Sequence, residues 1–284
     1  MSSATRVTER ILLVGATGFL GSFVAERLHD RSPVVLARPT SDLSVLPTNM
    51  EVRFGDVAQP LPLKQIDTLV YCASMGFGRI PELVKQLEAS TVKRAVFVST
   101  TAIYTKLPSA SRTVRLEAEA AVQASDLDWT ILRPTMIYGT AGDRNISRLL
   151  RFLARWPVFP LCGNALWQPI YVADLANAVV SALDSTRTVR RSYNLAGAEP
   201  ISFADLVRTA AQAVGRRVWL VPLPLQAAAL AARITRVVST EQIHRLTEDK
   251  TFSSAEAVQD FGFAPRTFAD GVRLEARGLG LAPD

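Results

Sequence analysis

The sequence predicts an α/β fold, with a parallel sheet covered by helices on both faces and a smaller region beside it. Short, almost wholly apolar runs alternate with segments of helical character, which is typical of parallel strands buried on both faces. A glycine-rich turn follows the first of these runs. From about residue 140 the alternation loosens, because prolines interrupt it and the helical segments become rich in Ala and Arg. The first half of the chain is therefore expected to form the sheet.

Six strands and three helices are expected in this first half. The apolar runs that predict strands are 10–14, 34–37, 51–54, 67–73, 94–99 and 128–133. The segments that predict helices are 18–28, about 79–91 and about 112–125. Because crossovers between parallel strands are almost always right-handed, this order gives a doubly wound sheet.

The second half is expected to form a smaller, mainly helical C-terminal lobe. We assign residues 1–139 to the sheet domain and 140–284 to the lobe, which would cover the cleft of the sheet domain. Within about 168–197, the run Pro169–Val172 and the helix after it predict a strand–helix return to the main sheet. Asp174 is expected to be the N-cap of that helix. Ser202, with an acid three residues later, predicts another helix start.

The turn after the first strand has the spacing that a phosphate group requires. Gly15 permits a tight bend, Gly18 lets the backbone approach a phosphate, and Gly21 lets the next helix pack closely on the strand. The free N–H groups and the positive dipole end of helix 18–28 would face the anion. Strand, turn and helix together predict a site for a dinucleotide pyrophosphate.

Composition excludes several classes of protein. With 284 residues, 48% of them hydrophobic, the chain can bury a large core. It has no apolar run of about 18 residues and its first ten residues are polar, so we expect no membrane span, no secretion signal and a cytoplasmic location. Cys72 and Cys162 lack partners at metal-ligand spacing, and His29 and His244 stand alone, so no metal site is expected.

The net charge of +6 is dispersed along the chain, and no nucleic-acid motif accompanies it. One stripe is concentrated, and it consists of Arg144, Arg148, Arg151 and Arg155. A solvated helix face is the expected interpretation, and an anionic substrate group or an acidic partner is the alternative. Assembly with further copies of the chain or with another protein is left open.

Six motifs, in this order and at these intervals, resemble those of one superfamily. They are Gly15-x-x-Gly18-x-x-Gly21, Gly55-Asp56, Tyr71–Ser74, Val98–Tyr104, Leu132–Gly139 and Tyr171–Asp174. The chain resembles the extended short-chain dehydrogenases/reductases over about residues 10–270, and the resemblance is thinner beyond 185. This superfamily comprises NAD-dependent epimerases and dehydratases together with atypical relatives. The resemblance implies a Rossmann fold that binds NAD or NADP, with a substrate held under the C-terminal lobe.

The resemblance also implies which residues contact the cofactor. Asp56 would accept from the adenine amino group, and a turn-forming Asp is the alternative. Ser74 and its neighbours would pass beside a ribose, and Pro134 would contact the nicotinamide. Cys72 is expected to be a small buried residue rather than a reactive thiol. The full predicted set is Gly15, Thr17, Gly18, Phe19, Leu20, Gly21, Arg38, Ser41, Asp56, Val57, Cys72, Ala73, Ser74, Thr100, Arg115 and Pro134.

The end of the second strand favours NADP over NAD. An NAD enzyme usually has an Asp or Glu there, which accepts from the ribose hydroxyls and repels a 2′-phosphate. This chain has Ala37-Arg38-Pro39-Thr40-Ser41 instead. Arg38 offers a fork of donors to a phosphate, with Ser41 as a helper, and an exposed loop arginine is the alternative.

The catalytic residues depart from the superfamily pattern of Ser/Thr, Tyr and a Lys four residues later. Thr100 occupies the Ser/Thr position, but Ser111 stands at the Tyr and Arg115 at the Lys. Arg115 retains the ability to hold ribose hydroxyls, whereas a serine hydroxyl is too weak an acid to replace a phenol. Tyr104 and Tyr138 are the nearest other acids, and each has a pocket-wall or buried-aromatic alternative.

Two functions stay open on this basis. One is an NADP(H)-dependent reductase or epimerase-like enzyme for a small carbonyl or nucleotide-sugar substrate, with Thr100, Tyr104, Tyr138 and Arg115 as catalytic candidates. The other is a non-catalytic NADP(H)-binding protein, such as a redox sensor or a structural subunit of a larger complex. Four aromatic residues, Trp156, Phe159, Trp167 and Tyr171, indicate either a pocket with apolar walls or a lobe core.

Overall fold

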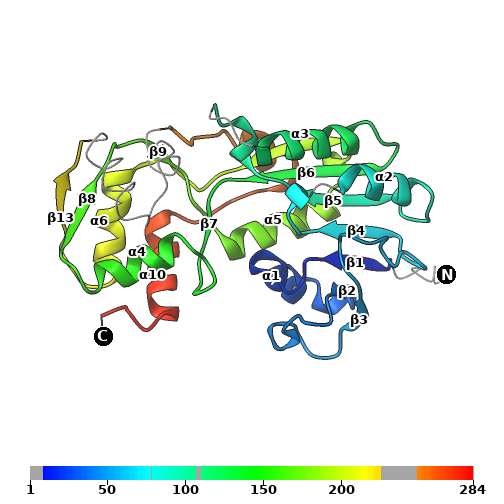
Figure 1. Cartoon of the computed structure of the whole chain (residues 1–284), viewed down its shortest axis with the longest axis horizontal. Coiled ribbons are helices and arrows are strands. Elements are labelled where there is room, and N and C mark those ends of the chain that lie inside the picture. Colours follow the sequence, from blue (N-terminus) through cyan, green and yellow to red (C-terminus); the bar gives the residue numbers. More distant parts are fainter. Residues whose placement is uncertain (1–8, 78, 107–109, 225–247, 284) are drawn as a thin grey trace, which may run out of the picture.

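The computed structural model describes residues 9–77, 79–106, 110–224 and 248–283, and it has the predicted fold class. Seven parallel strands form the central sheet in the order β11-β6-β5-β4-β1-β2-β3 (Figure 1). The strands are β1 (Ile11–Val14), β2 (Val34–Ala37), β3 (Glu51–Phe54), β4 (Thr68–Tyr71), β5 (Arg94–Val98), β6 (Asp128–Pro134) and β11 (Arg191–Leu195). The order along the sheet reverses beside β1, where its neighbours are β2 and β4. Ligands of such sheets bind at this reversal, outside the carboxyl ends of the strands.

Helices cover both faces of this sheet. On one face lie α1 (Phe19–Arg27) and α5 (Val172–Asp184), and on the other lie α2 (Ile80–Glu88) and α3 (Ala110–Gln123) (Figure 1). Short 3-10 turns punctuate the connections at His29–Arg31, Leu43–Val45, Met75–Phe77, Thr101–Tyr104 and Thr186–Thr188. Because both faces are covered, the central strands are apolar throughout; all four residues of β1, β2 and β4 are buried.

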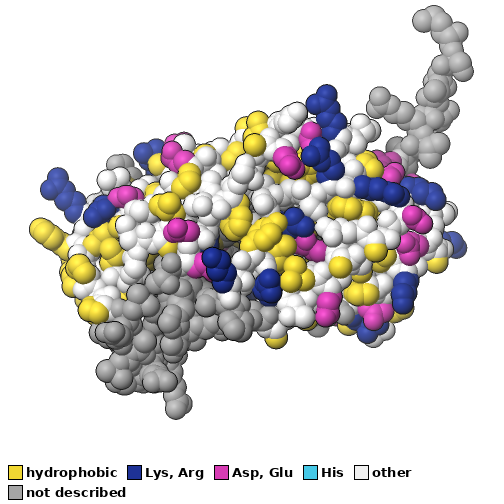
Figure 2. All heavy atoms as spheres, turned by 90° about the horizontal axis from the view of Figure 1, so that it is seen from above, with side chains coloured by type: hydrophobic (Ala, Val, Ile, Leu, Met, Phe, Trp, Pro, Cys, Tyr) yellow, Lys and Arg dark blue, Asp and Glu magenta, His cyan; other side chains and the backbone are white. Residues whose placement is uncertain are grey.

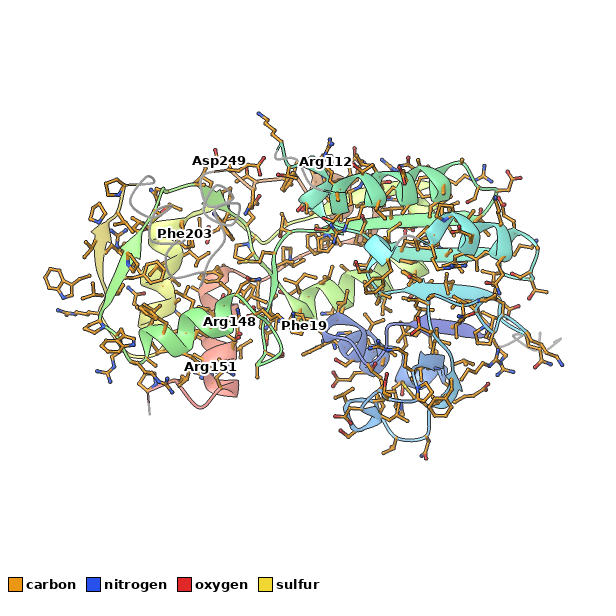
Figure 3. All side chains as sticks on the ribbon, in the orientation of Figure 1. Phe19, Arg112, Arg148, Arg151, Phe203 and Asp249 are labelled. Atoms are coloured by element: carbon orange, nitrogen blue, oxygen red, sulfur yellow. The ribbon has the colours of Figure 1, made fainter. Side chains whose placement is uncertain are left out.

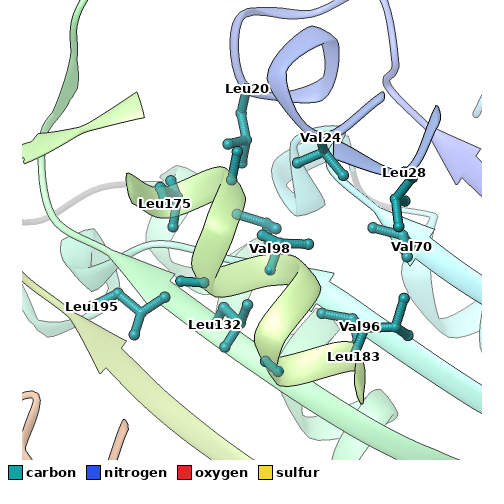
Figure 4. Close-up of a cluster of buried hydrophobic side chains, with 14 of the residues drawn as sticks. Leu20, Val24, Leu28, Val70, Val96, Val98, Leu132, Leu175, Leu183 and Leu195 are labelled. Atoms are coloured by element: carbon teal, nitrogen blue, oxygen red, sulfur yellow. The ribbon is translucent and has the colours of Figure 1, made fainter. Parts of the chain in front are cut away.

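Two layers of apolar side chains hold the sheet domain together, one on each face. Under α5, Leu175 and Leu183 pack with Val96, Val98 and Leu132 from the strands beneath them (Figure 4). A second cluster fills the space between the sheet and the α2–α3 face. Burial of this much apolar surface is the main stabilising contribution to the domain.

The C-terminal lobe is built around three helices, α4 (Ile146–Leu153), α6 (Phe203–Ala213) and α10 (Phe268–Gly278), which share a third apolar cluster. Three two-stranded sheets surround them. These pair β7 (Ile137–Tyr138) with β10 (Ile170–Tyr171), β9 (Leu166–Trp167) with β12 (Ile201–Ser202), and β8 (Val158–Leu161) with β13 (Trp219–Pro222). Helix α9 (Ala255–Phe261) lies within the residues assigned to the lobe, but it packs against β11 and α5 of the sheet domain.

The predicted return of Pro169–Val172 to the main sheet is wrong in one respect. Its strand, β10, pairs with β7 in a separate sheet, while α5 and β11 make the return. A two-residue strand offers few ladder bonds, so its partner is decided by the surrounding packing.

The predicted N-cap role of Asp174 is also wrong. Helix α5 begins at Val172, and the buried Asp174 carboxylate instead accepts a forked pair of bonds from Arg266 at 2.8–3.0 Å. This ion pair ties the start of α5 to the segment before α10. The Ser202 cap is confirmed, because its hydroxyl accepts from the amide of Asp205 over 3.1 Å.

Basic and acidic side chains are interspersed on the face of the molecule seen in Figure 2. Within the part of the chain that the structure describes, no helix combines the length and the apolar character that a membrane span requires.

Candidate functional site

The glycine-rich turn between β1 and α1 is packed too tightly for any other residue at two positions. Gly15 has a positive φ of 82°, and a Cβ there would lie 2.7 Å from the amide nitrogen of Ala73. A Cβ on Gly21 would lie 1.9 Å from the carbonyl oxygen of Gly15. The end of β1 is therefore in direct contact with the end of β4, and α1 lies directly on the turn.

The N-terminus of α1 is open to an anion. The backbone amides of Phe19, Leu20 and Gly21 donate to no acceptor among the described residues. The first turn of α1 also has no acidic side chain. A cleft of about 640 Å³ lies against this end of the helix. Its walls include Thr17, Gly18 and Phe19 on one side and the 140–145 loop of the lobe on the other. Figure 3 shows Phe19 at the junction of the two parts.

The end of β2 brings Arg38 and Asp56 to one edge of the sheet, because the amide of Gly55 donates to the carbonyl of Ala37 over 3.0 Å. The Arg38 side chain is exposed and has no hydrogen-bond partner among the described residues. Ser41 accepts from the Arg38 amide, so its hydroxyl shapes this turn. Asp56 likewise accepts from the amide of Ala58 over 2.8 Å. Both therefore have a turn role in addition to the predicted cofactor role.

The end of β4 gathers a second group of predicted cofactor residues. A Cβ on Gly76 would lie 3.3 Å from the Ser74 hydroxyl and 3.4 Å from a guanidinium nitrogen of Arg115, so these two side chains approach the same spot. Cys72 and Ala73 contact the Gly15 turn through their backbone. Burial raises the pKa of the Cys72 thiol to about 12, so this cysteine stays protonated and unreactive. Val57 and Ala73 both pack against the apolar cluster of this face.

The helix predicted to carry the catalytic pair places Ser111 and Arg115 on one side of α3. Arg115 donates to the Ser111 hydroxyl over 3.0 Å. The pair is thus assembled as the motif predicts, with a serine in place of a phenol. Thr100 lies just after β5 and its hydroxyl accepts from the amide of Ala102 over 3.2 Å. Its neighbour Thr101 donates to the carbonyl of Pro134, which joins the ends of β5 and β6.

Tyr104 lies in a charged hydrogen-bond network. Its phenol oxygen receives a bond from Arg133 over 3.0 Å and lies 3.3 Å from the side-chain oxygen of Asn194. The Arg133 guanidinium also pairs with Glu119 over 2.6 Å, and both of these side chains are largely buried. Ser99 donates to the same carboxylate over 2.5 Å. A cation that donates to a phenol oxygen stabilises negative charge on that oxygen.

Tyr138 lies in the core of the lobe rather than in the cleft. Its side chain is fully buried, and its hydroxyl donates to the carbonyl of Phe268 over 3.4 Å. A Cβ on Gly271 would lie 2.1 Å from that oxygen, which shows how closely α10 covers it. Burial, and secondarily the nearby carboxylates Asp174 and Glu275, raise the pKa of Tyr138 far above its usual range. A phenol in this position acts as an aromatic core residue.

Sequence reasoning missed Arg133, Glu119 and Asn194. Each lies on an element that the sequence predicted or named, but each is distant in sequence from Tyr104. One signal was present, namely that the predicted strand 128–133 ends in the charged residue Arg133 directly after the apolar pair Ile131-Leu132. A charge at such a position needs a buried partner.

Two buried acids, Asp143 and Glu275, lie beside each other next to the cleft. Asp143 lines the cleft and accepts from the amides that begin α4, those of Asn145, Ile146 and Ser147. Glu275 of α10 is only 1% exposed. Its burial, together with the neighbouring Asp143 carboxylate, raises the pKa of Glu275 to about 9. Glu275 is therefore a neutral acid at pH 7, packed against the helix cap of α4.

Comparison with known proteins agrees with this geometry. Residues 15–152 match the NAD(P)H-binding family. UDP-glucose 4-epimerase of Vibrio cholerae is 21% identical over 96% of both chains. A (4-alkanoyl-5-oxo-2,5-dihydrofuran-3-yl)methyl phosphate reductase of Streptomyces griseus is 29% identical, covering 87% of this chain and 90% of its own. NADH dehydrogenase (ubiquinone) 1 alpha subcomplex subunit 9 of Arabidopsis thaliana is 25% identical, over 88% of this chain and 73% of its own.

Among solved structures, the UDP-glucuronic acid 4-epimerase of Bacillus cereus in complex with NAD superimposes with a TM-score of 0.75. The match covers 96% of this chain and 99% of the epimerase at 16% identity, so the likeness is one of fold. Residues 15–152 are thus similar to an NAD(P)H-binding family, and the relatives and structural neighbours of the chain include nucleotide-sugar epimerases, one of them solved in complex with NAD.

Proposed function

We propose that this protein is an NADP(H)-dependent reductase or epimerase-like enzyme, with a rearranged proton donor. The observation that supports it best is the open N-terminus of α1 at the glycine turn. Three unbonded amides, the helix dipole and close approach of the backbone at Gly18 fit a pyrophosphate. Bound NADPH would supply the hydride, and the remaining steps fall to side chains of this chain.

The preference for NADP rests on Arg38. Its guanidinium is exposed at the end of β2, and it forms no ion pair with any described carboxylate. A planar fork of N–H donors matches a 2′-phosphate. The absence of an acid at the end of β2 removes the group that would repel that phosphate.

Tyr104 is the side chain that we assign to proton transfer. Its phenol is half exposed, at 44%, and follows Thr100 by four residues. Arg133 donates to the phenol oxygen and would stabilise the phenolate left after proton donation, the role that a lysine has in the superfamily pattern. Thr100 would polarise the substrate oxygen. Arg115, beside Ser74, would hold ribose hydroxyls.

The substrate class that fits this chemistry is a small carbonyl compound or a nucleotide sugar. The relatives named above include a reductase named for an alkanoyl-oxo-furan methyl phosphate, which is a carbonyl compound, and an epimerase named for UDP-glucose. Two assays test this directly: oxidation of NADPH by a panel of carbonyl compounds, measured as loss of NADPH fluorescence, and epimerisation of UDP-sugars by the protein loaded with NADP⁺. The proposal is supported if the wild type turns over one of these substrates, if Tyr104→Phe abolishes the turnover, and if Ser111→Ala leaves it intact.

A non-catalytic NADP(H)-binding role is the second candidate, and one observation favours it. The hydroxyl of Ser111 stands where the superfamily has its phenol and is engaged by Arg115. One relative is a subunit of a respiratory complex. Tight NADPH binding without oxidation by any carbonyl compound, and without epimerisation of any UDP-sugar by the NADP⁺-loaded protein, would decide for this role.

A further inference from the structure

A second cavity, of about 400 Å³, lies in the lobe between α4 and α6. Figure 3 labels two of its residues, Arg148 on α4 and Phe203 on α6. Its described walls are mostly apolar and aromatic. They are Met136, Arg144, Asn145, Ile146, Arg148, Leu149, Phe152, Phe159, Trp167, Phe203 and Leu206.

Four aromatic rings form a connected wall in this cavity. Phe152 meets Phe159 edge-on with ring centroids 5.8 Å apart, and Phe159 meets Phe203 at 6.1 Å. Phe203 in turn lies 5.5 Å from Trp167. Phe152 remains 38% exposed although it belongs to this cluster, so apolar surface is left uncovered. Of the aromatic residues that the sequence singled out, Phe159 and Trp167 line this cavity, whereas Trp156 is 60% exposed and stands outside the described lining.

The lining offers little that recognises a sugar. A sugar ring presents several hydroxyls, each of which needs a donor or acceptor when it is buried. The uncharged polar groups of the described lining are two, the side-chain amide of Asn145 and the indole N–H of Trp167, which has no hydrogen-bond partner among the described residues. A ligand with a hydrocarbon surface loses no hydrogen bonds against these walls and gains the burial of its apolar area.

The cavity nonetheless has two cations at its rim, Arg144 and Arg148. Both are exposed, and neither guanidinium has a hydrogen-bond or ion-pair partner among the described residues. The other two arginines of the stripe, Arg151 and Arg155, do not belong to the described lining. Half of the stripe is thus placed against an apolar cavity, which favours an anionic ligand over a purely solvated role.

The cavity also adjoins the cofactor cleft. Arg144 and Asn145 line both spaces, so they form the wall between them. At another point the cavity is lined by Met136, two residues after Pro134, which we expect to contact the nicotinamide. A molecule in the cavity would therefore extend from the basic rim toward the reacting end of the cofactor.

We infer that the α4–α6 cavity binds the substrate, and that this substrate is an amphiphilic anion: an aryl or acyl body against the aromatic wall, with a phosphate or carboxylate on Arg148. This inference rests on the proposed function and narrows its substrate class from sugars to apolar molecules. Arg144, between the two spaces, would face either this anion or the pyrophosphate of the cofactor.

The test is direct binding of 1-naphthyl phosphate, measured by calorimetry in the wild-type protein saturated with NADPH. We expect binding that is tighter than that of 1-naphthol and tighter than that of UDP-glucose. Arg148→Gln should weaken the phosphate about tenfold to hundredfold, as expected for a charged hydrogen bond, and should leave 1-naphthol unchanged. Arg155→Gln, the matched loss of charge on the same stripe, should have no effect.

Three results would overturn the inference: no measurable binding of 1-naphthyl phosphate, tighter binding of UDP-glucose, or equal losses in the two arginine variants. Phe203→Leu serves as the apolar counterpart and should weaken 1-naphthyl phosphate and 1-naphthol by the same factor. NADPH affinity is measured for every variant, and we expect it to be unchanged in Arg148→Gln. Because the test reads binding alone, it separates a wrong cavity assignment from an absence of turnover.

Discussion

Arg133 donates to the phenol oxygen of Tyr104 over 3.0 Å while the same guanidinium is held by Glu119 over 2.6 Å. The carboxylate fixes the cation, and the cation is directed at the phenol. Strands β6 and β11 supply Arg133 and Asn194 as register partners, so the contacts to Tyr104 are built on the sheet rather than on loops. Through this network the chain has a phenol, that of Tyr104, beside a fixed cation, although Ser111 stands at the position on α3 where the superfamily pattern has its tyrosine.

Tyr104→Phe should lower kcat by about a hundredfold or more, because it removes the acid and little else. NADPH affinity should not change, since the phenol is not among the groups assigned to the cofactor. Rates and NADPH titrations on the purified variant check both points.

The matched control is Ser111→Ala, which should leave kcat within about threefold because a serine supplies no useful acid. A large loss of kcat in Ser111→Ala, together with full activity of Tyr104→Phe, would assign proton transfer to Ser111 instead of Tyr104.

Arg38→Ala should weaken NADPH binding about tenfold to hundredfold and leave NADH binding nearly unchanged, because only NADPH carries the phosphate that the guanidinium would bind. Fluorescence titration with both cofactors measures the two affinities. Arg155→Ala removes an equally exposed charge far from β2 and should affect neither cofactor. Equal losses for NADPH and NADH would mean that Arg38 contacts the adenine instead.

Glu275→Gln should stabilise the protein at alkaline pH. The pKa of Glu275 is raised from 4.5 to about 9, so between these values the unfolded chain ionises this group while the folded protein keeps the proton. Stability due to this group therefore falls as pH rises from about 5 to about 9, by up to about 1.4 kcal/mol per pH unit. Glu275→Gln does not lose stability in this way, because a glutamine side chain does not ionise.

Urea unfolding of both proteins at pH 5 and pH 8 measures the effect, and the advantage of the variant should be larger at pH 8 by about 1 kcal/mol or more. Glu117→Gln, an exposed glutamate on α3, provides the control and should show no such trend. A constant difference between Glu275→Gln and wild type at both pH values would rule out a neutral Glu275.

Gly21→Ala should destabilise the sheet domain by about 1–3 kcal/mol, because the new Cβ would lie 1.9 Å from the carbonyl oxygen of Gly15 and α1 must move. Gly278→Ala at the end of α10 meets nothing within 4 Å and should be neutral or slightly stabilising. Urea midpoints of the two variants test the contrast. Similar midpoints would mean that α1 does not lie this close to the turn.

The strands of the sheet were predictable because burial on both faces leaves a direct mark on the sequence. Run 34–37 coincides with β2, whose four residues are all buried, and the glycine turn gave the start of α1 to within one residue. Run 51–54 coincides with the edge strand β3, although none of its residues is buried. The pairing of β10 with β7 could not be predicted, because a strand of two residues is too short to show an alternation of apolar and polar side chains. The same holds for the cap of α5, where the partner of Asp174 is Arg266, far along the chain.

The site was predictable where it depends on local sequence and unpredictable where it depends on distant contacts. Glycine spacing and the i, i+4 pair of Ser111 and Arg115 are local, and the structure shows both as expected. The burial of Tyr138 depends on Gly271, whose missing side chain leaves room for the hydroxyl. Such a contact across more than a hundred residues cannot be read from either position alone.

The most direct test of the account is an NADPH titration of the wild-type protein beside Gly18→Val. Gly18 lies at the open end of α1, where a branched side chain would occupy the path of the pyrophosphate, while a Cβ at this position lies 3.1 Å from the Gly15 carbonyl and leaves the fold possible. We predict saturable NADPH binding by the wild type, none by Gly18→Val, and matching circular dichroism spectra. Equal NADPH affinity in a folded Gly18→Val protein, or no binding by the wild type, would contradict the assignment of this cleft to a dinucleotide.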